Sequence, residues 1–288
     1  MKKIKFLALI MVLLLFTGGF VGCARSLQSG SESSEASVLD TIKKNDKVRI
    51  GVFQDKPPFG YIDENGEFQG YDVYIAKRLA KDLLGDESKV EFVPVEAANR
   101  VEYIQSNKVD ILLANFTKTK ERTEVVDFAN PYMKVALGVV SPNGNVITDV
   151  EQLKGKKLIV NKGTTAELYF KENYPEIELL SFDQNTEAFN ALKDGRGAAL
   201  AHDNTLLFAW ASENPSFTVG MKSLGNQDVI APAIKKGETE LSDWINEEFE
   251  KLGKENFMHK AYEATLLPVY GEDISSDDVV IEGGKLEK

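Results

Sequence analysis

Short apolar runs alternate with stretches of helical periodicity along most of this chain. Three apolar runs in the first half predict strands, at residues 47–52, 90–95 and 109–114. Two helices are expected between them. Asp72 is expected to cap the first helix, in which Ile75 and Leu79 lie on one face. The second helix is expected at residues 99–106. This β-α-β-α-β order predicts a mostly parallel sheet covered by helices.

The same alternation restarts further along the chain. It predicts strands at residues 157–161, 179–182 and 198–201 and helices at 166–173, 186–193 and 202–210. Between the two units, the apolar and β-branched stretches 135–140 and 229–234 predict crossing strands. Two further helices are expected at 240–252 and 255–264, followed by an acidic tail.

The folded part of the chain is larger than one hydrophobic core holds comfortably, since it has about 250 residues. We therefore expect an α/β fold of two lobes, each built on a mostly parallel sheet and joined by two crossing strands. Lobe I is predicted to comprise residues 39–139 plus 231–288, and lobe II residues 140–230. Ligands of such sheets bind outside the carboxyl ends of the strands.

The first 22 residues differ from the rest of the chain. Three lysines precede an apolar stretch at residues 6–16, and small residues then lead to Cys23, the only cysteine. This order predicts an export signal over residues 1–22, and Gly22-Cys23 resembles the lipobox of bacterial lipoproteins, in which the cysteine is acylated. An ordinary secretory peptide with an incidental cysteine is the alternative. Residues 23–38, rich in Ser and Glu, predict a disordered tether.

The balance of charges and the rarity of Cys and His exclude several classes of function. The formal net charge is −11, and the leader contributes lysines but no acids. An acidic body disfavours nucleic acid and anionic lipid surfaces as partners. His202 and His259 are too far apart to suggest a metal site, and we interpret His202 as a packing or capping residue. We expect no metal, no cofactor and no internal disulfide.

Polar residues follow the predicted strand at 109–114 and suggest a carboxylate site. Asn115 and Thr117 come directly after this strand, and Arg122 follows five residues later. A guanidinium near free backbone N–H groups can hold a planar anion through charge-assisted bonds. Alone, this segment also fits the start of a surface helix with a solvated Arg.

Two further strand ends carry complementary chemistry. Thr164 and Thr165 begin a predicted helix, where backbone N–H groups and hydroxyls can bind an anion, although a simple helix cap is the alternative. Asp203 ends an apolar strand and is a candidate partner for an ammonium group, or only a cap of the next helix. A carboxylate held by Arg122 and the Thr165 helix, with an ammonium held by Asp203, describes an α-amino-acid zwitterion.

Several segments resemble the polar amino-acid-binding receptors of ABC transporters. They are residues 57–61, 70–72, 109–122, 126–132 and 162–165, within a similarity that spans about residues 46–264. The resemblance implies the two-lobed periplasmic-binding-protein fold of type II, which closes on its ligand. It also implies that Arg122 holds the α-carboxylate with help from Thr117, Thr164 and Thr165. Asp203 and the carbonyl of Ala114 would bind the α-amino group. The family usually has Ser where this chain has Ala114 and Asn115.

Two basic residues suggest which ligand side chain the pocket accepts. Lys56 and Arg100 are expected near its end, as in aspartate- and glutamate-binding relatives, unless they are solvated surface charges. Phe53, Phe59 and Asn115 complete the expected pocket, with core packing as the alternative for the two aromatic residues. Longer runs at residues 95–101, 113–117, 201–210 and 278–284 resemble cysteine-binding receptors, and a thiol also suits a cationic pocket.

We therefore expect a lipid-anchored receptor outside the cytoplasm that binds free L-cysteine and delivers it to a membrane permease. An aspartate or glutamate receptor is the alternative. A dehydratase-like enzyme on the same scaffold is the principal rival from another class and would need a general acid, for which Glu96 and Glu167 are the candidates. A ligand sensor that signals to a partner is a third reading. We expect a binding protein and not an enzyme.

Overall fold

Two five-stranded sheets organise the computed structural model, which describes residues 36–286. We call the part built on the first sheet lobe I and the part built on the second sheet lobe II. In spatial order, the first sheet contains β5 (Val90–Pro94), β1 (Val48–Val52), β6 (Ile111–Leu112), β13 (Ala233–Lys235) and β7 (Val126–Phe128). The second contains β10 (Glu178–Phe182), β9 (Lys157–Asn161), β11 (Ala199–Asp203), β8 (Met133–Pro142) and β12 (Phe217–Ile230).

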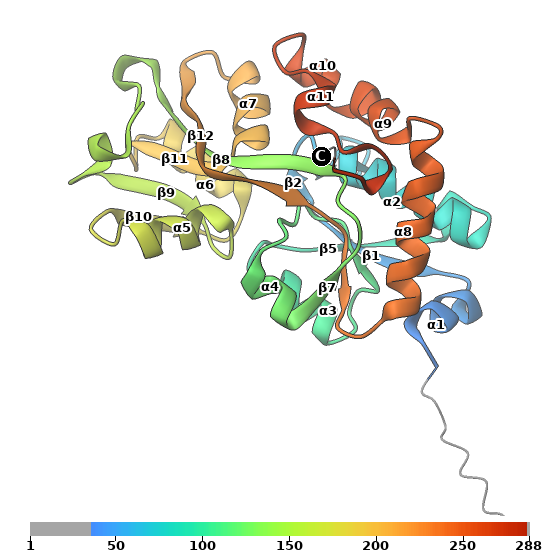
Figure 1. Cartoon of the computed structure of the whole chain (residues 1–288). Helices are drawn as coiled ribbons and strands as arrows, with labels where there is room; N and C mark the ends of the chain where they lie inside the picture. The colour runs from blue at the N-terminus through green and yellow to red at the C-terminus, as the bar shows by residue number, and fades with distance from the viewer. Residues whose placement is uncertain (1–35, 287–288) are drawn as a thin grey trace, which may run out of the picture. The chain divides into compact units, whose positions relative to one another are not determined.

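The predicted parallel pairing is present at one side of each sheet. Strand β1 runs parallel to β5 and β6, and β9 runs parallel to β10 and β11. The strands that bring the chain from one sheet to the other add antiparallel pairs, β13 with β6 and β7, and β8 with β11 and β12. Figure 1 shows β8 and β12 side by side. The carboxyl ends of β6, β9 and β11 are the strand ends that carry the predicted site.

The chain passes between the sheets after β7 and again after β12. The predicted single strand at 229–234 is wrong, because β12 ends at Ile230 and β13 begins at Ala233. Pro232 between them has no N–H to donate to a ladder. Its carbonyl instead accepts the N–H of Ala129 in the first connection, at 3.0 Å. The two connections therefore lie side by side.

Helices cover both sheets. Lobe I carries α1 (Val38–Asn45), α2 (Tyr71–Leu84), α3 (Arg100–Gln105), α4 (Lys120–Val125), α8 (Thr239–Gly253) and α9 (Phe257–Thr265). Lobe II carries α5 (Thr165–Asn173), α6 (Asn185–Lys193) and α7 (Asn204–Glu213) (Figure 1). The predicted cap at Asp72 is wrong: Gly70 is the residue before α2, and the Asp72 carboxylate points to other partners. A Gly with φ of 117° at this turn allows the sharp entry into the helix.

The predicted acidic tail is folded. It contains α10 (Leu267–Tyr270), α11 (Ser276–Val279) and a 3-10 turn at Glu282–Gly284. Val279, Val280 and Ile281 are buried, and this apolar run anchors the segment despite its charge. The Tyr270 hydroxyl donates to the carbonyl of Thr205 in α7 at 3.0 Å, so the C-terminal segment also touches lobe II.

A small sheet adjoins lobe I and positions one basic residue of the site. It consists of β2 (Asp55–Lys56), β3 (Gly60–Ile62) and β4 (Phe68–Gln69). The predicted export signal, Cys23 and nearly all of the predicted tether lie outside the described residues. Within residues 36–286 no helix has the length and apolar character needed to cross a bilayer.

Candidate functional site

The strand ends of both lobes enclose a narrow cavity. Its lining comprises Phe53, Lys56, Ala97, Arg100, Asn115, Thr117, Arg122, Thr164, Thr165, His202 and Asp203. The structure therefore brings together most residues predicted from the sequence, from segments that are up to 150 positions apart (Phe53 to Asp203). The cavity holds about 10 Å³, which is about the space one water molecule needs.

Two arginines of lobe I share one acceptor on lobe II. Arg122 Nη2 donates to the carbonyl of Gly163 at 3.0 Å, and Arg100 Nη2 donates to the same oxygen at 3.3 Å. Both guanidinium groups also lie over the ring of Phe116, at 4.2 Å and 4.5 Å from its centroid. The arrangement fixes two cations beside the amino-terminal end of α5.

Arg100 is not the solvated surface charge that the sequence left open. Its side chain is buried and donates to the carbonyls of Ala97 and Ala114 at 3.0 Å each. The predicted acceptor for an amino group, the Ala114 carbonyl, is thus already in use by Arg100. Burial lowers the pKa of Arg100 well below its ordinary value, and it lowers the pKa of Arg122 to about 10, so Arg122 remains charged at neutral pH.

Lys56 and Asp203 form a buried ion pair between the lobes. Lys56 Nζ lies 3.2 Å from Asp203 Oδ2 and 2.6 Å from Asn115 Oδ1, and Lys56 is only 1% exposed. Burial lowers the pKa of Lys56, against the attraction of Asp203. Burial alone would raise the pKa of Asp203, but the Lys56 ammonium holds it below the ordinary value. The capping alternative for Asp203 is wrong, because its side chain makes no capping hydrogen bond to α7.

Asn115 is held in an unusual conformation by Asp72. Its φ is 44°, in the left-handed region that Asn tolerates better than most residues. Asp72 Oδ2 accepts the Asn115 N–H at 2.8 Å, and Asp72 Oδ1 accepts the Tyr132 hydroxyl at 2.7 Å. Burial raises the pKa of Asp72 to about 6, although these hydrogen bonds oppose the effect. Asp72 thereby sets the direction of the Asn115 amide toward Lys56.

Thr164 and Thr165 lie at the amino-terminal end of α5, as predicted. The Thr164 hydroxyl caps the helix by accepting the N–H of Glu167 at 3.2 Å, and it donates to the carbonyl of Asn161 at 2.7 Å. The cap reading therefore holds for the Thr164 side chain. Thr165 is the first residue of α5, and N–H groups at this position have no partner within their own helix. The cavity thus has a backbone donor next to Arg122.

His202 lines the cavity. The sequence pattern indicates only a packing or capping residue and does not predict this position. Its ring Nδ1 accepts the backbone N–H of Asp203 at 2.6 Å, and the side chain is 2% exposed. Burial lowers the pKa of His202. Its position directly before Asp203, at the end of an apolar strand, was the signal available in the sequence.

The two predicted aromatic residues have different roles. Phe53 lines the cavity, and Lys56 Nζ lies 5.0 Å from its ring centroid. Phe59 is fully buried in the core of lobe I and does not line the cavity, although its ring lies 5.9 Å from the same Nζ. Core packing is therefore the correct reading for Phe59.

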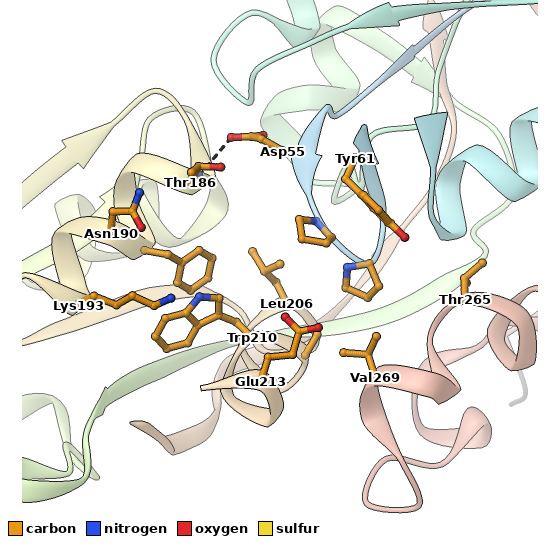
Figure 2. Close-up of a pocket in the computed structure, with 14 residues that line it drawn as sticks. Asp55, Tyr61, Thr186, Asn190, Lys193, Leu206, Trp210, Glu213, Thr265 and Val269 are labelled. Atoms are coloured by element: carbon orange, nitrogen blue, oxygen red, sulfur yellow. Dashed lines mark hydrogen bonds between the residues drawn. The ribbon is translucent and has the colours of Figure 1, made fainter. Parts of the chain in front are cut away.

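A second, larger cavity of about 360 Å³ contains none of the predicted site residues. Figure 2 shows the side chains of α6 and α7 on one side and those of Tyr61, Thr265 and Val269 on the other. Trp210 stacks on Phe189 with ring centroids 4.6 Å apart, and both are part of this wall. Most of its polar side chains are solvated, so it lacks the desolvated charges of the narrow cavity.

Comparisons with known proteins identify the family of this chain. The model of the bacterial extracellular solute-binding proteins, family 3, matches residues 48–266. A cysteine-binding protein from Campylobacter jejuni is 62% identical, with a TM-score of 0.85 over 86% of this chain and 100% of that one. A solute receptor for L-cysteine of Neisseria gonorrhoeae is 60% identical, with a TM-score of 0.84 over the same shares.

A relative that is named for a different ligand has lower identity. The ABC transporter glutamine-binding protein GlnH of Bacillus subtilis is 36% identical over 264 residues, which is 91% of this chain and 96% of that protein.

Proposed function

The chain belongs to the bacterial extracellular solute-binding proteins, family 3, and on this premise we propose that it is the amino-acid receptor of an ABC importer with L-cysteine as its ligand. The observation that carries the proposal is that buried charges of opposite sign, Arg122 of lobe I and Asp203 of lobe II, line one cavity. An α-amino acid presents the complementary carboxylate and ammonium. The two solved proteins with about 60% identity are described as binding cysteine.

Each end of the ligand has a defined partner in the proposal. Arg122, with the Thr117 side chain and the amino-terminal end of α5 at Thr164 and Thr165, binds the α-carboxylate. Asp203 binds the α-ammonium. Lys56, Arg100, Phe53 and Asn115 surround the side chain.

Entry of a ligand requires the lobes to separate. The cavity volume of about 10 Å³ is far below that of an amino acid, and Gly163 of lobe II closes it against Arg100 and Arg122 of lobe I. The two adjacent connections between the sheets are the natural hinge, because few residues there absorb the rotation. The ligand then stabilises the closed form by contacting both lobes at once.

The partner of the closed form is a membrane permease, as for other receptors of ABC importers. We also propose that the chain is exported, that residues 1–22 are removed, and that Cys23 carries the lipid that anchors the protein on the outer side of the membrane. The assignment of residues 39–139 plus 231–288 to lobe I and 140–230 to lobe II is part of the same proposal, with the difference that β8, which begins at Met133, pairs within the sheet of lobe II.

We propose binding without catalysis. Neither candidate general acid lines the cavity, and the Glu167 carboxylate is occupied by the N–H of Gly163 at 2.9 Å and by Lys171 at 2.9 Å. The aspartate or glutamate alternative has its own support, because Lys56 and Arg100 would suit a second carboxylate.

A thermal-unfolding screen of the purified protein against the twenty amino acids, with reductant, tests the proposal. A ligand at 100-fold its dissociation constant adds about 2.7 kcal/mol, which raises the melting temperature by several degrees at about 2–4 °C per kcal/mol. We expect the largest shift with L-cysteine. If only aspartate or glutamate shifts the melting temperature, the ligand is that amino acid and not cysteine. If no amino acid shifts it, the receptor assignment is overturned.

A further inference from the structure

The side chains around the narrow cavity carry more positive than negative charge. Lys56, Arg100 and Arg122 supply three cations, each at most 8% exposed. Among the described residues that line the cavity, Asp203 alone supplies a carboxylate. Asp72 stands one layer behind, where Tyr132 and the backbone of Asn115 donate to its oxygens.

His202 does not add a fourth positive charge. Its Nδ1 accepts the backbone N–H of Asp203, so this nitrogen carries no proton and the ring is neutral with its proton on Nε2. Neutral His202 can donate one hydrogen bond and cannot balance a charge. The cavity is therefore lined by these three cations, Asp203 and a neutral imidazole. Asp72 lies behind Asn115, and the half-buried Asp228 of β12 lies near Arg122 and Asp203.

An α-zwitterion alone leaves Lys56 without an anionic partner. In the proposed function the ligand ammonium pairs with Asp203, which is the carboxylate that contacts Lys56 in this structure. Buried charges without partners are costly. An anionic group on the ligand side chain would replace Asp203 beside Lys56.

We infer that the receptor binds L-cysteine with its thiol deprotonated, and that Lys56 is the partner of the thiolate. The inference rests on the proposed function and names the ionisation state of its ligand. It follows from an exchange of ion pairs. In this structure Lys56 pairs with Asp203 at 3.2 Å, and the α-ammonium of the ligand takes over Asp203. The thiolate then replaces Asp203 as the anion beside Lys56.

Lys56 suits this role better than the two arginines. The Arg100 guanidinium already donates to four backbone carbonyls, of Ala97, Ala114, Asn115 and Gly163. Arg122 lies at the carboxylate end beside Thr117. Lys56 Nζ has three N–H donors, of which Asn115 and Asp203 take two, and the rings of Phe53 and Phe59 exclude water around it.

Binding in this form releases a proton. The S–H bond breaks, the electron pair stays on sulfur, and the proton passes to the buffer. A free thiol has a pKa of about 8.5, so only a few per cent of it is ionised at pH 7. Binding at pH 7 should therefore release close to one proton per cysteine, and the apparent dissociation constant should fall about tenfold per pH unit between pH 6.5 and 8.

Isothermal titration calorimetry of the purified protein in two buffers of different ionisation enthalpy counts this proton. L-Cysteine with a phosphine reductant is the ligand, and L-serine and S-methyl-L-cysteine are controls without a thiol. We expect release of about one proton with cysteine and none with the controls that bind. Cysteine binding without proton release, or equal release with serine, would overturn the thiolate while the proposed function stands. Absence of cysteine binding would overturn the proposed function itself.

Two variants test whether Lys56 is the cation that pairs with the thiolate. Lys56→Met should bind cysteine more weakly, with proton release and pH slope both reduced, whereas Lys120→Met, on the exposed start of α4, should behave as the parent. Circular dichroism checks that both variants fold. If Lys56→Met retains the full proton release, Lys56 is not the partner of the thiolate.

Discussion

The carboxylate of Asp55, in lobe I, accepts two hydrogen bonds from Asn185, the first residue of helix α6 in lobe II. The backbone N–H of Asn185 lies 2.8 Å from Oδ2 and its side-chain amide 3.0 Å from Oδ1. The N–H of Thr186 lies 3.3 Å from Oδ2, and Figure 2 shows this bond as a dashed line. The residue before α6, Gln184, makes no side-chain capping bond. Asp55 thus caps a helix of the opposite lobe.

Replacement of Asp55 by Ala should weaken ligand binding, because the cap forms only when the lobes are together. Loss of an N-cap costs about 0.5–2 kcal/mol, which predicts an increase of the dissociation constant by about 2- to 30-fold. Calorimetry measures this change. Asp149→Ala removes a cap within one lobe and is the matched control. Equal affinities of Asp55→Ala and the parent would show that the cap does not contribute to closure.

Gly163→Ala should block closure. A Cβ at this position would lie 2.7 Å from Cα of Ala98 and 2.9 Å from the carbonyl oxygen of Ala97, which belong to lobe I. Gly195 has a similar φ, 68° against 74°, but open space around it. Both Ala variants should therefore lose about 1 kcal/mol of stability from the backbone strain.

Only Gly163→Ala should also lose ligand affinity. Thermal unfolding and calorimetry on the two variants separate strain from closure. The prediction is wrong if both glycine variants bind the ligand equally well.

Arg122→Lys should bind the ligand much more weakly although it keeps the positive charge. Lysine cannot reproduce the planar fork that reaches both Gly163 and a carboxylate. A charge-assisted bond contributes about 1.5–3 kcal/mol, so we expect a loss of about 10- to 150-fold. Arg78→Lys, a partly exposed arginine on α2, is the control. A loss below twofold in Arg122→Lys would remove this residue from the binding site.

Asp72 should make the folded state less stable as the pH rises. Its pKa is about 6 in the folded state against an ordinary 3.8, so the folded state binds the proton more tightly. The unfolded chain then holds fewer protons than the folded one between these values, and stability decreases with pH across this window. Asp72→Asn removes this dependence.

Relative to the parent, Asp72→Asn should therefore gain about 2 kcal/mol between pH 4.5 and pH 7.5. Urea unfolding at the two pH values measures the difference. A constant difference between the two proteins would show that Asp72 ionises normally.

The sequence predicted what depends on local pattern. The alternating apolar runs located β1, β9 and β11. Polar residues that follow strands of the two sheets, such as Thr117 and Asp203, line one cavity, as expected for a ligand site outside the carboxyl ends of strands. The resemblance to amino-acid-binding receptors is confirmed, as is the α/β fold.

Features that depend on how distant segments meet could not be predicted. Asp55 and Asn185 are 130 positions apart, and nothing in either segment indicates the other. Asp72 fits a helix cap locally, but a buried tyrosine and a backbone N–H compete for its carboxylate. His202 and Arg100 depend on burial, which is a property of the assembled lobes and not of their own segments.

The small volume of the cavity that Arg122 and Asp203 line has a consequence for the kinetics of ligand binding. In the proposed function an amino acid cannot enter a cavity of this volume, so each binding event requires the lobes to separate first. At low ligand concentration the capture rate depends on the fraction of time the lobes spend apart, and at high concentration it reaches a ceiling set by how often they open. The same opening controls departure, so a bound amino acid is retained for as long as the lobes stay together.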